Sequence, residues 1–483
     1  MYIIEADYQP HPDNNLNDNP LTEALSVHLN RNTFLDGITV KPKIQSDFWS
    51  LPPFYQMTQL RQLTDAHLPL PQTWSMYNKL LGLMIYSYVK RHPLSRDTEL
   101  LKARVAEQLR EGKFPVGIPV GMTTAPTVLV SGDSGTGKTT TIRTVLRRIP
   151  QVIRHTSYKG QHFRNMQLTW ISFDLPPNGA PKAMANNFFI AVDQAMGTSY
   201  AAEWGARHKE SVDKHLSGMQ QVALEHHLGL VHVDELQFML AYAKNANSPS
   251  LQILESLFNK LGIPIVQSST EAGVALFDTL DTGDHRIGSD ITTVRRMLND
   301  RAFKFSNHKL ESDYFQQLFN SLYPQSLIVK SEGEDQAALL EKFKARFHQL
   351  SCGLPAIMIR LALLHHETLV TLLGKSEDEQ KGYHTYQVGL LNRVYKNQFG
   401  LIDPALAQYR SGNKTEYESS IRTDTHKSVY SNKELQKEQK KCPKKQAQLV
   451  KNEMPQDQNL MLGLDTNPLD PVFLTGFEES NNV

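Results

Sequence analysis

Residues 126–150 read PTVLVSGDSGTGKTTTIRTVLRRIP, and this stretch decides the fold. The run at 127–130 is short, apolar and β-branched, which is typical of a buried strand. A glycine-rich turn follows, and 138–149 then shows helical spacing that stops at Pro150. The turn fits the pattern G-x-x-x-x-G-K-S/T, in which glycines let backbone N–H groups form a concave cradle for phosphates. The sequence therefore predicts a strand, a phosphate-binding loop and a helix in succession.

This loop predicts a set of nucleotide-binding residues: Gly132, Asp133, Ser134, Gly135, Thr136, Gly137, Lys138, Thr139 and Thr140. We expect Lys138 to act in catalysis by reaching the β- and γ-phosphates of ATP, and Thr139 to place its hydroxyl on Mg²⁺. A glycine-rich turn that matches by chance is the alternative. The flanking strand and helix argue against it, because they are the context that the motif needs.

A second catalytic signal lies at 229–233, where the apolar run GLVHV is followed by Asp234 and Glu235. Downstream of a phosphate-binding loop, such a strand end is a Walker B pattern. Asp234 would hold Mg²⁺ through its water shell, and Glu235 would orient and deprotonate the attacking water. The acidic pair favours a hydrolysing ATPase over a small-molecule kinase with the same loop.

Three histidines near this strand, His226, His227 and His232, raise the question of a metal site. One of them falls inside the predicted strand, and no cysteine or carboxylate spacing supports a ligand set. We therefore expect no metal at these histidines.

The segment between Asp133 and Asp174 contains no acidic residue but several lysines and arginines. Such a local positive field predicts salt-dependent, sequence-independent contact with nucleic-acid phosphates, and a solvated basic face is the alternative. We favour Arg154, Lys159 and Arg164 as DNA-binding residues, because they lie beyond the helix in an expected loop.

The residues that sense the γ-phosphate are expected after a further strand at 263–267, where Ser269 and Thr270 lie at the end that faces the ligand. Plain capping is the alternative for both. Two arginines, Arg295 and Arg296, precede a last strand at 302–305. They suit an arginine finger that reaches the ATP of a neighbouring subunit, with a solvated helix end as the alternative.

Residues 307–410, which follow the core, show helical spacing without strand signals. They predict a helical lid. Arg360 lies about one and a half turns into its second clear helix, where it could reach the phosphates as a further sensor. From 411 to 483 we expect a flexible tail, with a charge-dense linker at 433–446. Apolar residues among acids at 452–483 suggest a peptide that docks on a partner, and a tail without a role is the alternative.

The composition bounds the class of protein. A length of 483 residues predicts about two or three domains, and the net charge of +1 confines any nucleic-acid surface to a local patch. Cys352 and Cys442 lie far apart and predict a reducing compartment. The N-terminus lacks the basic start of a signal peptide, and the longest apolar run, around 80–89, is too short to span a bilayer. We expect a soluble cytoplasmic protein.

The N-terminal side divides into two parts. Residues 1 to about 50 are polar and follow no sustained period, which predicts an extended arm or a partner-binding segment. Helical spacing over 77–93 and 97–110 predicts a small helical region, either a structural prefix or a docking surface. We expect domains at 1–115, 116–306, 307–410 and 411–483.

The order of these motifs resembles an AAA+ ATPase with a helical lid, and more narrowly the transposon-encoded AAA+ regulators of the TnsC/TniB type. The resemblance covers about 77–305 and rests on YSYVKRHP, VLVSGDSGTGKTTTIRTVL, QLTWISFDLPPNGAPKA, FFIAVDQAMGTSY, LGLVHVDELQ and LFNKLGIPIVQSSTEA. It implies an α/β fold: a P-loop AAA+ three-layer core with a parallel sheet, a helical N-terminal prefix, a helical lid and a flexible C-terminal tail. Two positions depart from the pattern. Ser269-Thr270 replaces Gly-Thr, and Ala356 stands where an arginine sensor often lies.

The resemblance also implies partners and a function. ATP-bound subunits of such a bacterial protein would assemble side by side on double-stranded DNA as a ring or filament. The assembly would link a target-selection protein to the transposase subunits, a DDE transposase and its endonuclease partner, and hydrolysis would disassemble it. A replication initiator or helicase loader is the first alternative, but no winged-helix pattern follows residue 400. A scaffold that binds ATP only to oligomerise is the second, and the intact motifs argue against it.

Overall fold

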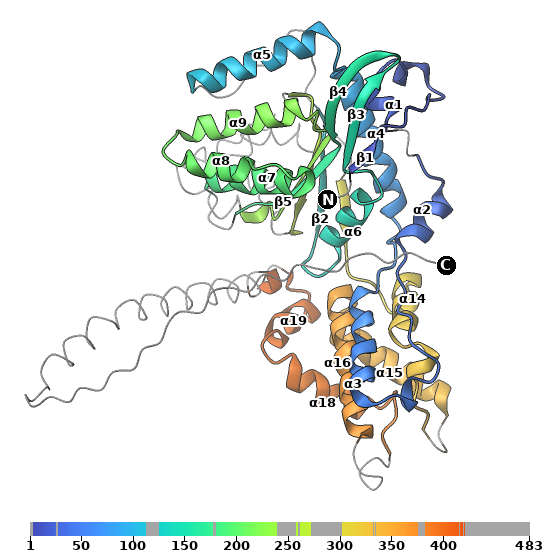
Figure 1. Cartoon of the computed structure of the whole chain (residues 1–483). Helices are drawn as coiled ribbons and strands as arrows, with labels where there is room; N and C mark the ends of the chain where they lie inside the picture. Colours follow the sequence, from blue (N-terminus) through green and yellow to red (C-terminus); the bar gives the residue numbers. More distant parts are fainter. Residues whose placement is uncertain are drawn as a thin grey trace, which may run out of the picture. The chain divides into compact units, whose positions relative to one another are not determined.

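The computed structural model describes residues 3–25, 28–112, 125–176, 180–238, 257–258, 261–271, 302–331, 333, 335–374, 382–414, 416–418 and 420. Within these residues, a five-stranded sheet runs in the order β5-β6-β7-β2-β8, and each of its pairings is parallel (Figure 1). Its strands are β2 (Thr127–Gly132), β5 (Trp170–Asp174), β6 (Leu230–Asp234), β7 (Ile265–Ser269) and β8 (Ala302–Phe305). The predicted α/β class is confirmed.

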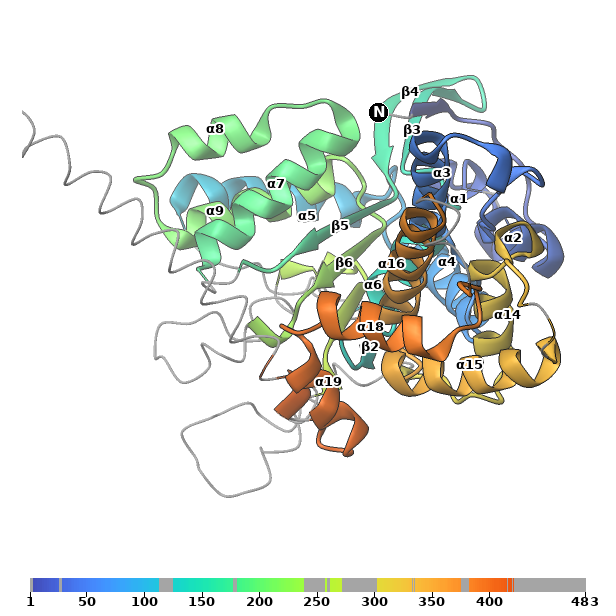
Figure 2. The ribbon, with the colours of Figure 1, turned by 90° about the horizontal axis from the view of Figure 1, so that it is seen from below.

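Helices cover both faces of this sheet. They are α4 (Thr73–Lys90), α5 (Arg96–Glu111), α6 (Lys138–Leu146), α7 (Pro181–Met196), α8 (Tyr200–Ala206) and α9 (Val212–Glu225). Successive strand residues point to opposite faces, so Val128 and Val130 pack with α4 and α6, while Leu129 packs with α7 and α9. Figure 2 shows α7 and α9 on one side of the sheet and α4 on the other, which confirms the three-layer core.

The first 50 residues pack against this core, although their sequence predicted an extended arm or a partner-binding segment. Their elements are β1 (Ile3–Glu5), η1 (Asn14–Leu16), α1 (Pro20–Glu23) and α2 (Arg31–Ile38). Leu21 and Phe34 are fully buried in the cluster that contains α4. The expectation of an arm is wrong because these apolar residues follow no period and each packs singly on a surface that distant segments supply.

A β-hairpin follows α6, where the sequence predicted a loop. β3 (Val152–Tyr158) pairs with β4 (Gln161–Leu168) in antiparallel fashion and with β1 in parallel. Lys159 and Gly160 join the two strands with φ angles of 47° and 75°, as in the two-residue turns that favour hairpins. Arg154, Lys159 and Arg164 therefore belong to a hairpin rather than to a loop.

The helical lid is confirmed in the described residues. It contains α14 (Asp313–Leu322), η6 (Gln325–Leu327), α15 (Gln336–Ser351), α16 (Pro355–Leu373), α18 (Val388–Gln398) and α19 (Asp403–Arg410). A second segment, with η2 (Phe48–Ser50), α3 (Pro53–Leu60) and η3 (Arg61–Asp65), buries Phe48, Leu60 and Leu63 in the same hydrophobic cluster. The lid thus combines two segments that lie far apart in the sequence, which the sequence did not predict. The expected division into four domains stays a prediction.

One lid helix, α16, is long and apolar enough to cross a membrane by length and composition alone. Met358, Leu361 and Leu369 on this helix are fully buried in the hydrophobic cluster of the lid. Such burial is typical of a core helix, which passes the same test of length and composition.

Candidate nucleotide-binding site

The predicted nucleotide-binding residues lie in one turn between the end of β2 and the start of α6. Gly132 has a φ of 154°, and a Cβ there would lie 2.3 Å from the carbonyl oxygen of Phe305 on β8. Gly137 caps α6 in the left-handed conformation with a φ of 89°. These two glycines let the chain turn sharply beside β8 and present the N-terminus of α6 to the loop.

The Lys138 ammonium folds over this turn. Its Nζ donates hydrogen bonds to the carbonyl oxygens of Gly132, at 2.6 Å, and of Asp133, at 3.0 Å. Burial lowers the pKa of Lys138, and the surrounding carboxylates, Glu418 foremost, oppose this shift. The predicted phosphate-binding lysine therefore lies inside the loop, close to the backbone that would surround a phosphate chain.

The ends of α6 and β6 meet at the predicted magnesium site. The Thr139 hydroxyl donates a hydrogen bond of 2.7 Å to Oδ2 of Asp234. Ser268 Oγ donates to Oδ1 of the same carboxylate at 2.6 Å, and the backbone N–H of Glu235 donates at 2.8 Å. Burial alone would raise the pKa of Asp234, but His232 and the donors from Ser268 and Thr139 hold it below its usual range.

This arrangement fits Mg²⁺. A hydroxyl and an ionised carboxylate, both hard oxygen ligands, face each other at the end of the loop. Among the described residues, no three His, Cys, Asp or Glu side chains gather as a metal cage. An ion held by Thr139 and Asp234 would therefore keep waters and nucleotide phosphates as its other ligands, which is the usual situation of Mg²⁺.

The predicted catalytic Glu235 sits directly after β6 with a φ of 60°, which is rare for a residue with a side chain. The side-chain amide of Gln237 donates to Oε2 of Glu235, and its Oε1 accepts from the backbone N–H of Thr270 at 3.4 Å. Gln237 thus connects the predicted base to the predicted sensor at the end of β7. Sequence reasoning noted this glutamine only as part of a motif.

The sensor predictions differ in their surroundings. Ser268, rather than Ser269 or Thr270, contacts Asp234. The Ser269 hydroxyl is buried and has no hydrogen-bond partner among the described residues, so it stays a candidate for a ligand contact. The alternation of side chains along β7 decides which of two adjacent serines lies on the same face of the sheet as His232 and Asp234, and this depends on the strand's register.

Behind Asp234, a hydrogen-bond chain orients His232. Burial lowers the pKa of His232 to about 4, so the imidazole is neutral near pH 7. Ser268 donates to Asp234, and it therefore accepts from Nε2–H of His232 at 2.8 Å. Nδ1 is then the acceptor of the Ser172 hydroxyl, also at 2.8 Å. The histidine supports the acidic site through hydrogen bonds.

Two other histidines lie apart from that chain. His226 shares a 2.8 Å hydrogen bond with the Tyr200 hydroxyl, and burial lowers its pKa. His227 is buried, and its pKa is well below the ordinary value for the same reason.

The lid reaches the loop at the first turn of α16. The backbone N–H of Ala356 donates to the carbonyl oxygen of Gly135 at 3.3 Å. Arg360, one turn further, is exposed and holds its guanidinium over the ring of Phe399, with 5.2 Å to the centroid. The proposed finger residues Arg295 and Arg296 lie outside the described residues.

The beginning of the predicted flexible tail also packs on the loop. Lys414 in the tail, like Tyr409 at the end of lid helix α19, contacts Oδ2 of Asp133 at 2.7 Å. The backbone N–H of Ser134 donates to Glu418 at 2.6 Å, and the Tyr417 hydroxyl donates to the Ser134 carbonyl at 3.0 Å. The expectation of flexibility therefore fails at this point, where tail side chains are buried against the loop.

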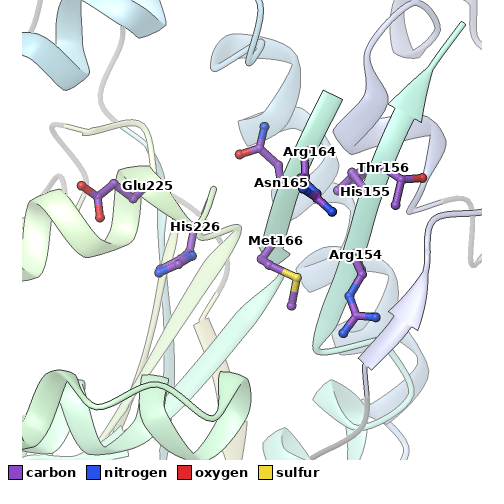
Figure 3. Close-up of a pocket in the computed structure, with 8 residues that line it drawn as sticks. All are labelled: Arg154, His155, Thr156, Arg164, Asn165, Met166, Glu225 and His226. Atoms are coloured by element: carbon purple, nitrogen blue, oxygen red, sulfur yellow. The ribbon is translucent and has the colours of Figure 1, made fainter. Parts of the chain in front are cut away.

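The predicted DNA-binding residues lie on the β3–β4 hairpin. Arg154 pairs with Glu5 at 3.0 Å, and Lys159 pairs with Asp18 and, at 3.6 Å, with Glu23. Figure 3 shows Arg154 and Arg164 on the two neighbouring strands, beside a cavity of about 490 Å³. Glu225 and His226, at the end of α9, line the same cavity. The hairpin thus brings two of the three predicted cations together.

Comparisons with known proteins address the class of this site. Residues 122–277 match the family model described as an AAA domain. Among solved structures, the chain is similar to the Walker-type ATPase paby2304 of Pyrococcus abyssi, with 13% identity and a TM-score of 0.34 over 64% of this chain and 74% of that chain. It is also similar to Drosophila ORC bound to DNA, with 12% identity and a TM-score of 0.32 over 78% of this chain and 86% of that chain. No curated protein matches the chain.

The family match and the parallel sheet with its phosphate-binding loop agree. Residues 122–277 therefore form an AAA domain with a P-loop AAA+ fold. The narrower resemblance to regulators of the TnsC/TniB type stays a prediction.

Proposed function

We propose that this chain is an ATP-dependent, DNA-binding AAA+ regulator of DNA transposition. The observation that carries the ATP-hydrolysing part is the 2.7 Å hydrogen bond between Thr139 and Asp234, with Glu235 one residue further. It joins the phosphate-binding loop to the acidic strand end, so that binding and hydrolysis groups share one site.

In the proposed reaction, water attacks the γ-phosphorus of ATP, the bond to the β–γ bridging oxygen breaks, and ADP and phosphate result. Glu235 accepts the proton of the attacking water, and Gln237 orients its carboxylate. Lys138 moves from the loop carbonyls to the β- and γ-phosphates. Mg²⁺ held at Thr139 and Asp234 would neutralise the charge of the phosphate oxygens.

The proposed DNA contact uses the β3–β4 hairpin. Its exposed arginines would lie along phosphates of double-stranded DNA without reading bases, in a salt-dependent manner. Arg164 is the strongest candidate, because Arg154 and Lys159 are already paired with acidic residues of the N-terminal segment.

The transposition role rests on the sequence resemblance to TnsC/TniB-type regulators. ATP-bound subunits would assemble on target DNA as a ring or filament and connect a target-selection protein to the transposase and its endonuclease partner. Arg295 or Arg296 would reach the ATP of a neighbouring subunit. Hydrolysis would take the assembly apart, in a bacterial cytoplasm.

The experiment compares DNA complexes of the full chain by gel filtration and electron microscopy with a slowly hydrolysed ATP analogue, with ADP and without nucleotide. We expect rings or filaments on duplex DNA with the analogue alone. Identical behaviour in the three states would contradict the proposed switch and favour a nucleotide-binding scaffold. Assembly only on particular DNA sequences would instead favour a replication-initiator type of function.

A further inference from the structure

The phosphate-binding loop is covered by a segment that none of the proposed functions uses. We name residues 409–414 and 416–418 the strap. It begins at the end of α19 and crosses the loop at Asp133 and Ser134. Its side chains make four polar contacts there, between 2.6 and 3.0 Å long.

The strap is built into the lid. The rings of Tyr409 and Tyr417 meet edge to face, with centroids 4.8 Å apart, and both belong to the hydrophobic cluster of the lid. The Tyr409 hydroxyl and the Lys414 ammonium share one oxygen of Asp133, a carboxylate that is almost fully buried. These contacts fix the strap in one register on the loop, so the residue that follows them reaches a defined place.

That residue is Glu418. Its side chain accepts a hydrogen bond of 2.6 Å from the backbone N–H of Ser134, inside the phosphate-binding loop, and the residue is only 3% exposed. A carboxylate oxygen on a backbone N–H of this loop makes the contact that a phosphate oxygen would make. Among the carboxylates that raise the pKa of Lys138, Glu418 has the largest effect. Its negative charge therefore lies close to the predicted phosphate-binding lysine.

Glu418 and a polyphosphate are therefore competitors. Both are anions, Glu418 takes a backbone N–H donor of the phosphate-binding loop, and like charges at one buried site repel strongly. Lys138 meanwhile turns to the carbonyl oxygens of Gly132 and Asp133, which it must leave to bind phosphate. Without a nucleotide, the Ser134 N–H and the Lys138 ammonium of this loop thus both hold protein partners.

We propose that the strap is an autoinhibitory plug, in which Glu418 occupies the phosphate cradle and must leave before ATP binds. This inference rests on the proposed nucleotide-binding function of the same loop. Tyr409 and Tyr417 of the strap pack in the hydrophobic cluster of the lid. Release of the plug therefore requires that the contacts between the strap and the lid rearrange.

The test measures binding of ATP, and of inorganic tripolyphosphate as a probe of the phosphate cradle alone, to the full chain. The variant is Glu418→Gln, and the matched control is Glu416→Gln, two residues earlier at an exposed position. We expect Glu418→Gln to bind both ligands about tenfold more tightly, because a neutral amide holds the Ser134 N–H less strongly and does not repel phosphate. Glu416→Gln should bind like the unmodified chain.

A second variant guards against a folding defect in the first. Tyr417→Phe removes only the hydroxyl that donates to Ser134, and it should tighten ATP binding about two- to tenfold. ATP binding that is unchanged or weaker in both variants would overturn the plug and leave the nucleotide-binding function in place. Failure of the unmodified chain and of Glu418→Gln to bind ATP at all would overturn the proposed function and the plug with it.

Discussion

The Thr139 hydroxyl donates a 2.7 Å hydrogen bond to the Asp234 carboxylate across 95 residues of sequence. The contact exists because β2 and β6 are parallel strands of one sheet, so their carboxyl ends meet at the same edge. One edge therefore collects the phosphate-binding loop, the acidic pair and the residues after β7.

Replacement of Asp234 should uncouple magnesium from nucleotide. We expect Asp234→Asn to weaken the Mg²⁺-dependent part of ATP affinity by about 10- to 100-fold, because the amide keeps the shape but loses the charge. The measurement is ATP binding with Mg²⁺ and with a chelator. The matched control is Asp174→Asn, because Asp174 on β5 pairs in register with Asp234 but has its closest ion pair, at 2.6 Å, with Arg143, which lies 3.9 Å from Asp234. Equal losses in both variants would contradict the magnesium assignment.

Replacement of Gln237 should impair catalysis through the position of Glu235. Gln237→Ala removes the side chain that connects Glu235 to the N–H of Thr270, and a misplaced base lowers kcat by up to about 10²-fold. We expect KM to change little, because Gln237 is not among the phosphate-binding residues. The control is Gln221→Ala, which removes the same kind of amide–carboxylate contact with Glu225 on α9. A kcat equal to that of the unmodified chain would show that Glu235 is oriented by other groups.

Replacement of Arg164 should lower the salt dependence of DNA binding. We expect the slope of log K against log salt to fall by about 0.9 in Arg164→Gln. The effect should be smaller for Arg154→Gln, since Glu5 already neutralises that guanidinium. Glu5→Gln should instead steepen the slope, because it removes the charge that neutralises Arg154. It is therefore the opposite test to Arg154→Gln. A slope unchanged by all three substitutions would place the DNA surface elsewhere.

The sequence predicted those parts of the site that a single segment determines. The phosphate-binding loop, α6 and the acidic end of β6 each follow from local spacing, and the structure brings them together. Ser268 and Gln237 were missed as site residues because their roles depend on the register of β7 beside β6. The strap on Asp133 and the N-terminal segment on α4 were missed for a similar reason: each is stabilised by contacts across more than 60 residues, which no local pattern encodes.

Stability should fall in mild acid because of a buried lid histidine. Burial lowers the pKa of His366 to about 4 from 6.5, so between these values the unfolded chain binds a proton that the folded chain does not. The stability contributed by neutral His366 is present above pH 6.5 and is lost as the pH falls to about 4. The full effect is about 3 kcal/mol.

The test compares unfolding at pH 6.5 and pH 4.5. His366→Gln keeps a donor for the Leu322 carbonyl and removes the titrating group, so its loss of stability on acidification should be smaller. Burial also lowers the pKa of the neighbouring His365, so part of the pH dependence of stability should remain in His366→Gln. His162→Gln, on the exposed side of β4, should keep the full pH dependence. The same slope in His366→Gln as in the unmodified chain would contradict the assignment.

Gly353 should be indispensable for the junction between core and lid. It has a φ of 65°, and an added Cβ would lie 1.9 Å from the carbonyl oxygen of His308, a backbone atom that cannot move aside without moving the segment after β8. The Gly353 carbonyl also accepts a hydrogen bond of 3.0 Å from the His308 N–H, which holds these two segments of the chain close together. We expect Gly353→Ala to lower the free energy of unfolding by about 2–4 kcal/mol.

The counterpart is Gly82→Ala in α4, where an added Cβ meets nothing within 4 Å and helix propensity should raise stability by about 0.5–1 kcal/mol. Urea unfolding of both variants checks the pair. If Gly353→Ala unfolded like Gly82→Ala, the close approach at His308 would not constrain the junction. Because Ala356, three residues after Gly353, donates its N–H to the Gly135 carbonyl of the loop, the unfolding loss should be accompanied by weaker nucleotide binding.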